Sequence, residues 1–370
     1  MTQPRYTPLR DRHETLGASF TDFGGWAMPV RYTSDLAEHH AVRTAAGLFD
    51  ISHMAEFFVS GAGAGEYLDY ALAGRHSTLT VGRAKYSLLL AEHGGIVDDL
   101  IVYRLEDEMF LVIANAGNRD AVAAALAEAA EGRDVRVVDA TEDYSLVAVQ
   151  GPAARAVLDA TSGLRGFTLP LNELTYYAAV AASFEDRPVL IARTGYTGED
   201  GYELLIPNDS AAALWDALRA AGEPHGLVPA GLAARDTLRL EAGMPLYGHE
   251  LSREILPAQA GLARVVALDK DDFVGRAGLV DASATEAPVL VGLVAEGKRA
   301  GRAGYAVLDH SGAVVGEITS GALSPTLGHP IAMAFVSPAL SAPGTTLFID
   351  VRGTRIPATV TALPFYRRAA

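Results

Sequence analysis

The chain turns at a pair of glycines and enters a predicted strand in the stretch Gly94-Gly95-Ile96-Val97-Asp98-Asp99-Leu100-Ile101-Val102-Tyr103. Successive side chains of a strand point to opposite faces, so the adjacent carboxylates Asp98 and Asp99 cannot do the same work. We expect one of them to face solvent or cap the turn, and Asp99 to point inward with Ile101 and Tyr103, which share its parity. An inward carboxylate must be hydrogen-bonded, paired or used in chemistry. The alternative is a pair of carboxylates that only stabilises the turn.

Composition is that of an ordinary globular chain and excludes several kinds of function. With 370 residues, 49% hydrophobic and 20% charged, the chain can form two or three domains. No apolar run is long enough for a membrane helix, and the N-terminus lacks the apolar core of a secretion signal, so we expect a cytoplasmic protein. The absence of cysteine excludes disulfides, thiolate nucleophiles and cysteine-bound metals, and no other metal motif occurs. A formal charge of −15 argues against nucleic-acid binding.

A pattern of elements occurs twice, at a spacing typical of one small domain. Each copy has a strand, a glycine, a helix, a second strand, a glycine-rich acidic turn, a third strand and an alanine-rich helix. The first copy uses residues 57–61, 64–72, 86–90, 94–95, 109–114 and 120–130, and the second uses 146–151, 153–160, 189–192, 194–201, 202–206 and 211–221. The order predicts two related β-α-β-β-α units, and ligands favour the junction of such units.

From residue 289 the pattern changes to short strands separated by tight turns. The predicted strands are 289–295, 305–308, 314–320, 331–336, 346–351 and 356–363, and the small-residue segment 281–288 before them is typical of a linker. We therefore predict an α+β fold. Residues 1–280 hold the two repeats, about 50–140 and 141–265, and residues 288–367 form a small all-β barrel.

Polar residues recur at corresponding places of the two copies and on the helix that follows them. They are Asp99 and Asn115 in the first copy, Tyr196 and Glu203 in the second, and Arg235 on the helix. This set suits a flat polar heterocycle, because a carboxylate can accept two hydrogen bonds from an amino-pyrimidinone edge of the pterin kind. The alternative is a buried Arg235–Glu203 salt bridge that binds no ligand.

Hydrolase motifs are absent, since the chain has neither G-x-S-x-G nor H-E-x-x-H. The segment Ser52-His53-Met54 comes closest to a catalytic pattern, with His53 as a base. We favour the alternative that His53 is a packed histidine of the core.

Several blocks of the sequence together resemble the aminomethyltransferase (T-protein) family of the glycine cleavage system. The blocks are DFGGWAMP at 22–29, HAVRT at 40–44, GLFDISHM at 47–54, the glycine turn at 94–102, RTGYTGEDGYE at 193–203 and GLAARDTLRL at 231–240. Related folate-dependent proteins share single blocks, whereas the full set is specific, and the match extends to LPFY at 363–366.

The resemblance implies a three-lobed fold in which residues 1–280 are the folate-binding region, with the barrel as third lobe. It also implies tetrahydrofolate as cosubstrate and the aminomethyl-lipoyl arm of the H-protein as donor. Asp99 corresponds to the family's functional carboxylate, which we expect to take a nitrogen proton or to stabilise developing positive charge. Folate-contacting positions match Asn115, Tyr196, Glu203 and Arg235, and pocket-lining positions match Met54, Tyr86 and Tyr103.

Three related functions are alternatives. A folate-dependent demethylase shares the fold, and only substrate assays separate it from an aminomethyltransferase. A non-enzymatic iron–sulfur assembly factor carries a cysteine in K-G-C-Y-x-G-Q-E, where this chain reads GMPLYGHE at 243–250. A folate-linked amine oxidoreductase needs a fused flavin domain, for which this chain has neither the length nor the fingerprint.

Overall fold

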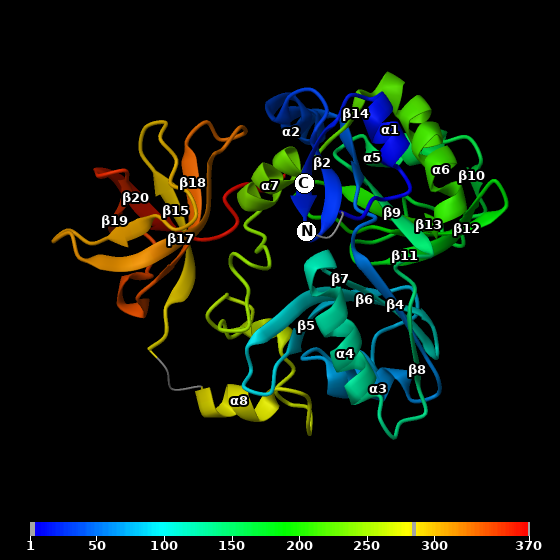
Figure 1. Cartoon of the computed structure of the whole chain (residues 1–370), viewed down its shortest axis with the longest axis horizontal. Helices are drawn as coiled ribbons and strands as arrows, with labels where there is room; N and C mark the ends of the chain where they lie inside the picture. The colour runs from blue at the N-terminus through cyan, green and yellow to red at the C-terminus, as the bar shows by residue number, and fades with distance from the viewer. Residues whose placement is uncertain (1–3, 283–285, 369–370) are drawn as a thin grey trace. The chain divides into compact units, whose positions relative to one another are not determined.

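The structure is a computed structural model that describes residues 4–282 and 286–368 (Figure 1). The chain divides into two compact units. The first holds the described residues up to Ala71 together with Arg75–Ser87 and Leu100–Arg235; the second holds Leu72–Gly74, Leu88–Asp99 and the described residues from Asp236 onward. Strands β5 and β6 and helix α7 each run from one unit into the other.

A seven-stranded sheet forms a large part of the first unit. Its strand order is β10-β11-β12-β13-β9-β3-β14, and the last pair is parallel. The strands are β3 (Ala46–Asp50), β9 (Tyr144–Gln150), β10 (Leu164–Arg165), β11 (Ala179–Phe184), β12 (Arg187–Ala192), β13 (Gly201–Pro207) and β14 (Leu227–Pro229). Helices α5 (Ala154–Ala160) and α6 (Asn208–Gly222) bury Leu158, Leu214 and Trp215 in the core of this sheet. Full burial of each such side chain contributes roughly 1.5–3 kcal/mol.

A five-stranded sheet has the order β5-β6-β7-β4-β8. Its strands are β4 (Ala55–Ser60), β5 (Ala84–Leu90), β6 (Ile96–Glu106), β7 (Met109–Ala114) and β8 (Arg136–Asp139). Helices α3 (Ala64–Ala71) and α4 (Arg119–Ala129) lie side by side next to it, joined where the hydroxyl of Tyr67 donates to Leu126 O at 2.6 Å (Figure 1). The order β5-β6-β7-β4 matches β11-β12-β13-β9 in the other sheet, so the two units are related. The predicted β-α-β-β-α pattern is one strand short, because three strands of this order follow the first helix of each unit, and the predicted strand 86–90 corresponds to β11 and not to 189–192. The repeat boundaries 50–140 and 141–265 stay a prediction.

The remaining elements are short or flank the sheets. Those that begin in the first unit are α1 (Arg10–Thr15), β1 (Ser19–Phe23), β2 (Trp26–Arg31), α2 (Asp35–Thr44), η1 (Ala116–Asn118), η2 (Glu223–His225) and α7 (Leu232–Glu241). Those of the second unit outside the barrel strands are η3 (Ala263–Val265), α8 (Arg276–Asp281) and η5 (Pro338–Leu340).

A short turn carries the chain from the seven-stranded to the five-stranded sheet, between β3 and β4. Oδ1 of Asp50 accepts the N–H of Ser52 at 2.9 Å, and the N–H of Met54 donates to Ile51 O at 3.1 Å. The Ser52 hydroxyl accepts from the Leu146 N–H at 3.1 Å and donates to the Leu146 carbonyl at 3.2 Å. This turn therefore holds residues 51–54 at the junction of the two sheets.

The glycine turn at residues 94–95 leads into β6, as predicted. Gly95 is required because a Cβ there would lie 1.7 Å from Arg253 O. Asp98 is completely buried, whereas Asp99 and Ile101 are partly exposed. The expectation that Asp98 faces solvent is wrong, because neighbours that share its parity, such as Leu100, are buried as well; its capping of the turn stays a prediction. Asp99 is the more accessible of the two carboxylates.

A closed barrel forms the C-terminal part of the second unit and confirms the sequence prediction. Its strands are β15 (Val289–Ala295), β16 (Ala306–Leu308), β17 (Val314–Leu323), β18 (Pro330–Val336), β19 (Thr346–Val351) and β20 (Thr354–Thr361). They pair in the order β15-β18-β17-β16-β19-β20, and β20 pairs back with β15. Inward side chains such as Leu293, Val307 and Ile318 fill its core. The predicted α+β class is confirmed; of the predicted linker 281–288, residues 283–285 lie outside the described residues.

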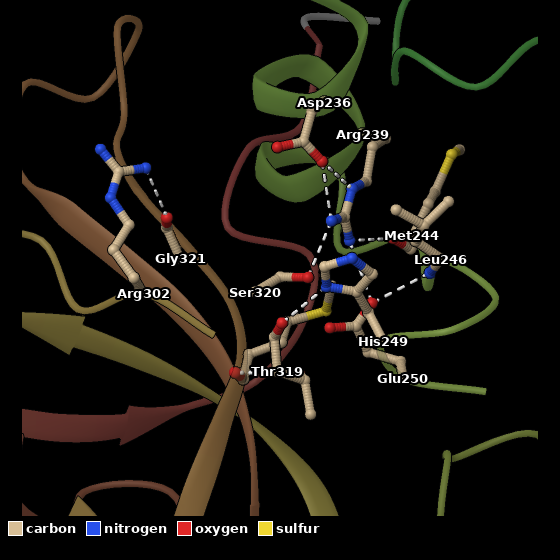
Figure 2. A network of polar contacts seen from close by, with 11 residues as sticks. Asp236, Arg239, Met244, Leu246, His249, Glu250, Arg302, Thr319, Ser320 and Gly321 are labelled. Atoms are coloured by element: carbon tan, nitrogen blue, oxygen red, sulfur yellow. Dashed lines mark hydrogen bonds and ion pairs between the residues drawn. The ribbon is translucent and has the colours of Figure 1, made fainter. Parts of the chain in front are cut away.

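A buried arginine ties the end of α7 to the barrel within the second unit (Figure 2). Arg239 is 2% exposed; its Nη1 donates to Glu250 Oε2 at 3.0 Å and its Nη2 to Ser320 Oγ at 2.7 Å. Its Nε also donates to Asp236 Oδ1 at 2.9 Å. Glu250 Oε2 further accepts the N–H of Leu246 at 2.9 Å. One cation therefore joins a helix, the loop that follows it and strand β17.

Candidate functional site

A chain of hydrogen bonds links the two sheets inside the first unit. The hydroxyl of Thr194 donates to Glu203 Oε2 at 2.5 Å, and the hydroxyl oxygens of Tyr103 and Thr194 are 3.2 Å apart. Because a threonine hydroxyl has one proton, Tyr103 is the donor in the second bond. Tyr103 comes from β6 and Glu203 from β13, so two of the predicted site residues meet through a threonine that the sequence analysis did not select. The position of Thr194 in the Thr-Gly-Tyr-Thr-Gly loop, two residues before Tyr196, is the sequence feature that could have identified it.

Burial sets the protonation states of the hydrogen-bonded residues Tyr103 and Glu203. Burial raises the pKa of the Glu203 carboxyl, although the Thr194 hydrogen bond and the charge of Arg235 act in the opposite direction. Burial and the nearby Glu203 raise the pKa of Tyr103 well above its ordinary value. Tyr103 therefore keeps its proton and remains a hydrogen-bond donor at neutral pH.

Arg235 lies near the hydrogen-bonded residues Glu203 and Thr194 and has an unused hydrogen-bond donor. Its guanidinium carbon is 5.0 Å from the centroid of the Tyr196 ring. Its Nη1 is buried and has no hydrogen-bonding partner among the described residues. Burial lowers the pKa of Arg235, which the charges of Glu203 and Tyr196 oppose. No ion pair joins Arg235 to Glu203 within residues 4–282 and 286–368, so the closed salt bridge considered in the sequence analysis is wrong.

The loop that carries Tyr196 is fixed by buried polar contacts. Arg43 Nη1 donates to Glu199 Oε1 at 2.9 Å and to Thr197 O at 2.7 Å. The amide of Gln150 donates to the Thr194 carbonyl at 3.1 Å and accepts from the Thr197 hydroxyl at 2.9 Å. A Cβ on Gly195 would lie 2.0 Å from Gln150 Oε1, so this position requires glycine. The Tyr196 ring is thus positioned before any ligand binds.

The remaining predicted site residues, Asn115, Met54, Tyr86 and Asp99, lie on or next to strands of the five-stranded sheet. Asn115 follows β7 one residue beyond the Ala55–Ala114 pair, so the register brings it opposite the partly exposed Met54. Tyr86 is partly exposed on β5. Asp99 belongs to the second unit, four residues before Tyr103 on the same strand. Their roles stay predictions.

No group of three or more His, Asp or Glu side chains in residues 4–282 and 286–368 is arranged to hold a metal ion. Over the same residues, no helix is long and apolar enough to cross a membrane.

Family models match both parts of the chain. The GCVT N-terminal domain matches residues 9–270, and the glycine cleavage T-protein C-terminal barrel domain matches residues 289–367. The chain belongs to the glycine cleavage T-protein family. This membership confirms the resemblance found in the sequence.

Relatives of this T-protein family chain match it over its full length. The aminomethyltransferase of Cutibacterium acnes is 56% identical over 373 residues, and that of Saccharopolyspora erythraea is 54% identical over 374, each covering 100% of both chains. The crystal structure of the glycine cleavage system aminomethyltransferase T from Bartonella henselae superposes with a TM-score of 0.90 at 38% identity, covering 98% of each chain. This T-protein family chain is therefore an enzyme of the transferase class.

Proposed function

We propose that this chain is the aminomethyltransferase of a glycine cleavage system and that its cosubstrate is tetrahydrofolate. The donor is the aminomethyl-lipoyl arm of the H-protein, and the products are 5,10-methylenetetrahydrofolate, ammonia and dihydrolipoyl H-protein. The family assignment and the full-length relatives support the reaction class. The observation that supports the cosubstrate is the polar cluster around Arg235, whose buried Nη1 has no partner within the described part of the chain. We further propose that the enzyme works in the cytoplasm.

The cluster fits the pteridine ring of tetrahydrofolate. Glu203 can accept hydrogen bonds from ring and amino N–H groups, and Arg235 can only donate, so it would contact a ring acceptor. An unpartnered buried donor costs about 1–3 kcal/mol, which a ligand acceptor would recover on binding. The Tyr196 ring offers a flat apolar face. We therefore keep Asn115, Tyr196, Glu203 and Arg235 as binding residues, with Met54, Tyr86 and Tyr103 lining the pocket.

Asp99 is proposed as the catalytic carboxylate. When bound, tetrahydrofolate supplies a nitrogen nucleophile for the methylene carbon. Asp99 would take the proton from that nitrogen or stabilise the positive charge that develops beside it. Its partial exposure leaves it accessible to substrate, whereas its neighbour Asp98 is fully buried. Arg235 and Glu203 orient the ring so that the reacting atoms align.

The reaction is tested with aminomethylated, lipoylated H-protein, by measuring ammonia and methylenetetrahydrofolate with and without tetrahydrofolate. We expect turnover that depends on folate. Asp99→Asn should reduce turnover by roughly 10²-fold or more and leave tetrahydrofolate affinity unchanged, as expected for loss of acid–base or electrostatic assistance. Arg235→Ala and Glu203→Ala should instead lose tetrahydrofolate binding.

Three outcomes would contradict parts of this proposal. Near-normal turnover of Asp99→Asn would remove its catalytic role, and retained binding by the two alanine variants would remove their binding role. Tight tetrahydrofolate binding by the unmodified enzyme without ammonia release would favour the demethylase or the assembly factor over the aminomethyltransferase.

A further inference from the structure

His53 has a ring nitrogen that the folded chain does not use. The side chain is 3% exposed, and its Nδ1 has no hydrogen-bonding partner among the described residues. The turn that carries it is rigidly hydrogen-bonded through Asp50 and Ser52, so its placement is defined. Most buried polar atoms in proteins have a partner, and each exception needs an explanation.

Another buried histidine of the first unit, His13, shows how both nitrogens of such a ring can be hydrogen-bonded. Nδ1 of His13 lies 2.9 Å from the Tyr32 hydroxyl, and its Nε2 lies 2.8 Å from Asp50 Oδ2. Asp50 also accepts from the Thr7 hydroxyl at 2.6 Å on Oδ2 and from a backbone N–H on Oδ1. The Asp50 carboxylate, whose charge acts on the His53 ring, is therefore bonded to other groups, and His53 Nδ1 has no hydrogen-bonding partner among the described residues.

The surroundings of His53 connect it to the binding cluster. The charge of Arg235 acts on its ring, and Nη1 of Arg235 is likewise without a hydrogen-bonding partner among the described residues. Burial lowers the pKa of His53 to about 4, with Asp50 opposing this shift and Arg235 adding to it. The ring is thus neutral at pH 7 and does not repel the guanidinium. It has one nitrogen that accepts and one that donates.

We propose that His53 is a further ligand-binding residue, whose ring hydrogen-bonds the heterocycle that Arg235 also contacts. The ligand's identity, the pteridine ring of tetrahydrofolate, rests on the proposed function. Arg235 can only donate, so it selects a ring acceptor, whereas a neutral imidazole can accept from a ring N–H as well. A guanidinium that only donates, together with a neutral imidazole within range of its charge that can also accept, would discriminate a nitrogen heterocycle from a purely anionic ligand.

The first test follows the histidine nitrogens directly. Protein labelled with ¹⁵N-histidine is titrated with tetrahydrofolate, and binding is confirmed in parallel by calorimetry. We expect the Nδ1 resonance of His53 to shift on binding, while the resonances of His13, whose nitrogens are already bonded, stay in place. A His53→Asn variant identifies the resonance and is also used in the second test.

The second test measures tetrahydrofolate affinity. His53→Leu keeps a similar volume without hydrogen bonds, and we expect it to bind roughly 5- to 10-fold more weakly, as for loss of one net hydrogen bond. His53→Asn, whose amide lies near the Nδ1 position, should recover part of this loss. Loss of Nδ1 should not lower the melting temperature of either variant, because this nitrogen has no hydrogen-bonding partner in residues 4–282 and 286–368.

The outcomes separate this inference from the proposed function. If the enzyme binds tetrahydrofolate while the His53 resonance stays fixed and His53→Leu binds as tightly as the unmodified protein, the inference is overturned and the proposed function stands. If the unmodified protein does not bind tetrahydrofolate, both are overturned. The spectroscopic test reads binding on the unmodified chain and needs a variant only to identify the His53 resonance, so His53→Leu can serve where His53→Asn fails to fold.

Discussion

Replacing Glu56 by methionine should stabilise the protein at neutral pH. Glu56 is completely buried on β4, and neither of its carboxyl oxygens has a hydrogen-bonding partner among the described residues. Burial raises the pKa of Glu56 well above its ordinary value; the charges of Asp139 and Glu142 add to this shift, and Arg119 opposes it. Methionine fills a similar volume and brings no group that needs a partner.

The magnitude follows from two terms. Removing an unsatisfied buried polar group recovers about 1–3 kcal/mol. In addition, because the pKa of Glu56 is raised by folding, the folded state keeps a proton that the unfolded chain has lost. This contribution of Glu56 to the free energy of unfolding is complete at a pH below the pKa of Glu56 in the unfolded chain. It is lost as the pH rises through the pKa of Glu56 in the folded protein, by up to about 1.4 kcal/mol per pH unit. The advantage of the methionine variant should therefore grow over this window.

Urea denaturation at pH 5, 6.5 and 8 measures this effect. Glu38→Met is the matched control, because Glu38 is equally buried but accepts the backbone N–H groups of Tyr32 at 2.7 Å, Thr33 at 3.0 Å and Gly231 at 2.9 Å. The control should lose about 3 kcal/mol or more at every pH. If Glu56→Met loses stability at pH 8 as the control does, Glu56 has a partner and the reasoning is refuted.

Three further predictions concern the site, the α7 anchor and acid stability. Gly195→Ala should weaken tetrahydrofolate binding about tenfold by calorimetry, since its Cβ would lie 2.0 Å from Gln150 Oε1 and force the loop to move; unchanged affinity would contradict the positioning argument. Arg239→Met should lower the free energy of unfolding by about 3–5 kcal/mol in urea denaturation, because it leaves the buried Glu250 carboxylate without its cation. Glu250→Met should cost less, because Arg239 keeps its ion pair with Asp236, and the double variant should cost less than the sum of the two; additive losses would disprove this. Burial acts to raise the pKa of Asp50, but its hydrogen-bonding neighbours hold it below the ordinary value. Its stabilisation is therefore present above about pH 4 and lost as the pH falls, so Asp50→Asn should be destabilising at pH 7 and nearly neutral in strong acid; an equal loss at both pH values would refute this.

The barrel could be predicted from the sequence because each strand carries its own signal. Alternating apolar residues set the strand faces, and a turn such as Arg352-Gly353 sets the pairing of its two neighbours. The predicted strand 356–363 is β20 (Thr354–Thr361), which differs by two residues at each end. Local pattern and tertiary structure agree here because a small closed barrel has one inner and one outer face throughout.

The site could be predicted only in part, because parity shows which residues share a face and not what covers that face. Asp98 is buried because its face of β6 is covered at that point, whereas Asp99 on the opposite face is partly exposed, and no local pattern records which face is covered. The sequence also brought Arg235 and Glu203 together as possible ion-pair partners. Whether they bond each other or a ligand depends on distances set by two separate sheets. The Thr194 bridge and the open nitrogen of His53 depend on the same distances.

The pairing of β20 with β15 makes the barrel's last strand decisive during synthesis. Chains grow from the N-terminus, so β15 to β19 emerge while β15 and β19 each present an unpaired edge. Exposed edges recruit other strands. A premature stop or a proteolytic cut before Thr354 would therefore leave an open sheet whose edge strands β15 and β19 can pair with other chains, and not a slightly smaller closed barrel. For a newly made chain, the final strand decides whether it folds alone or aggregates with its neighbours.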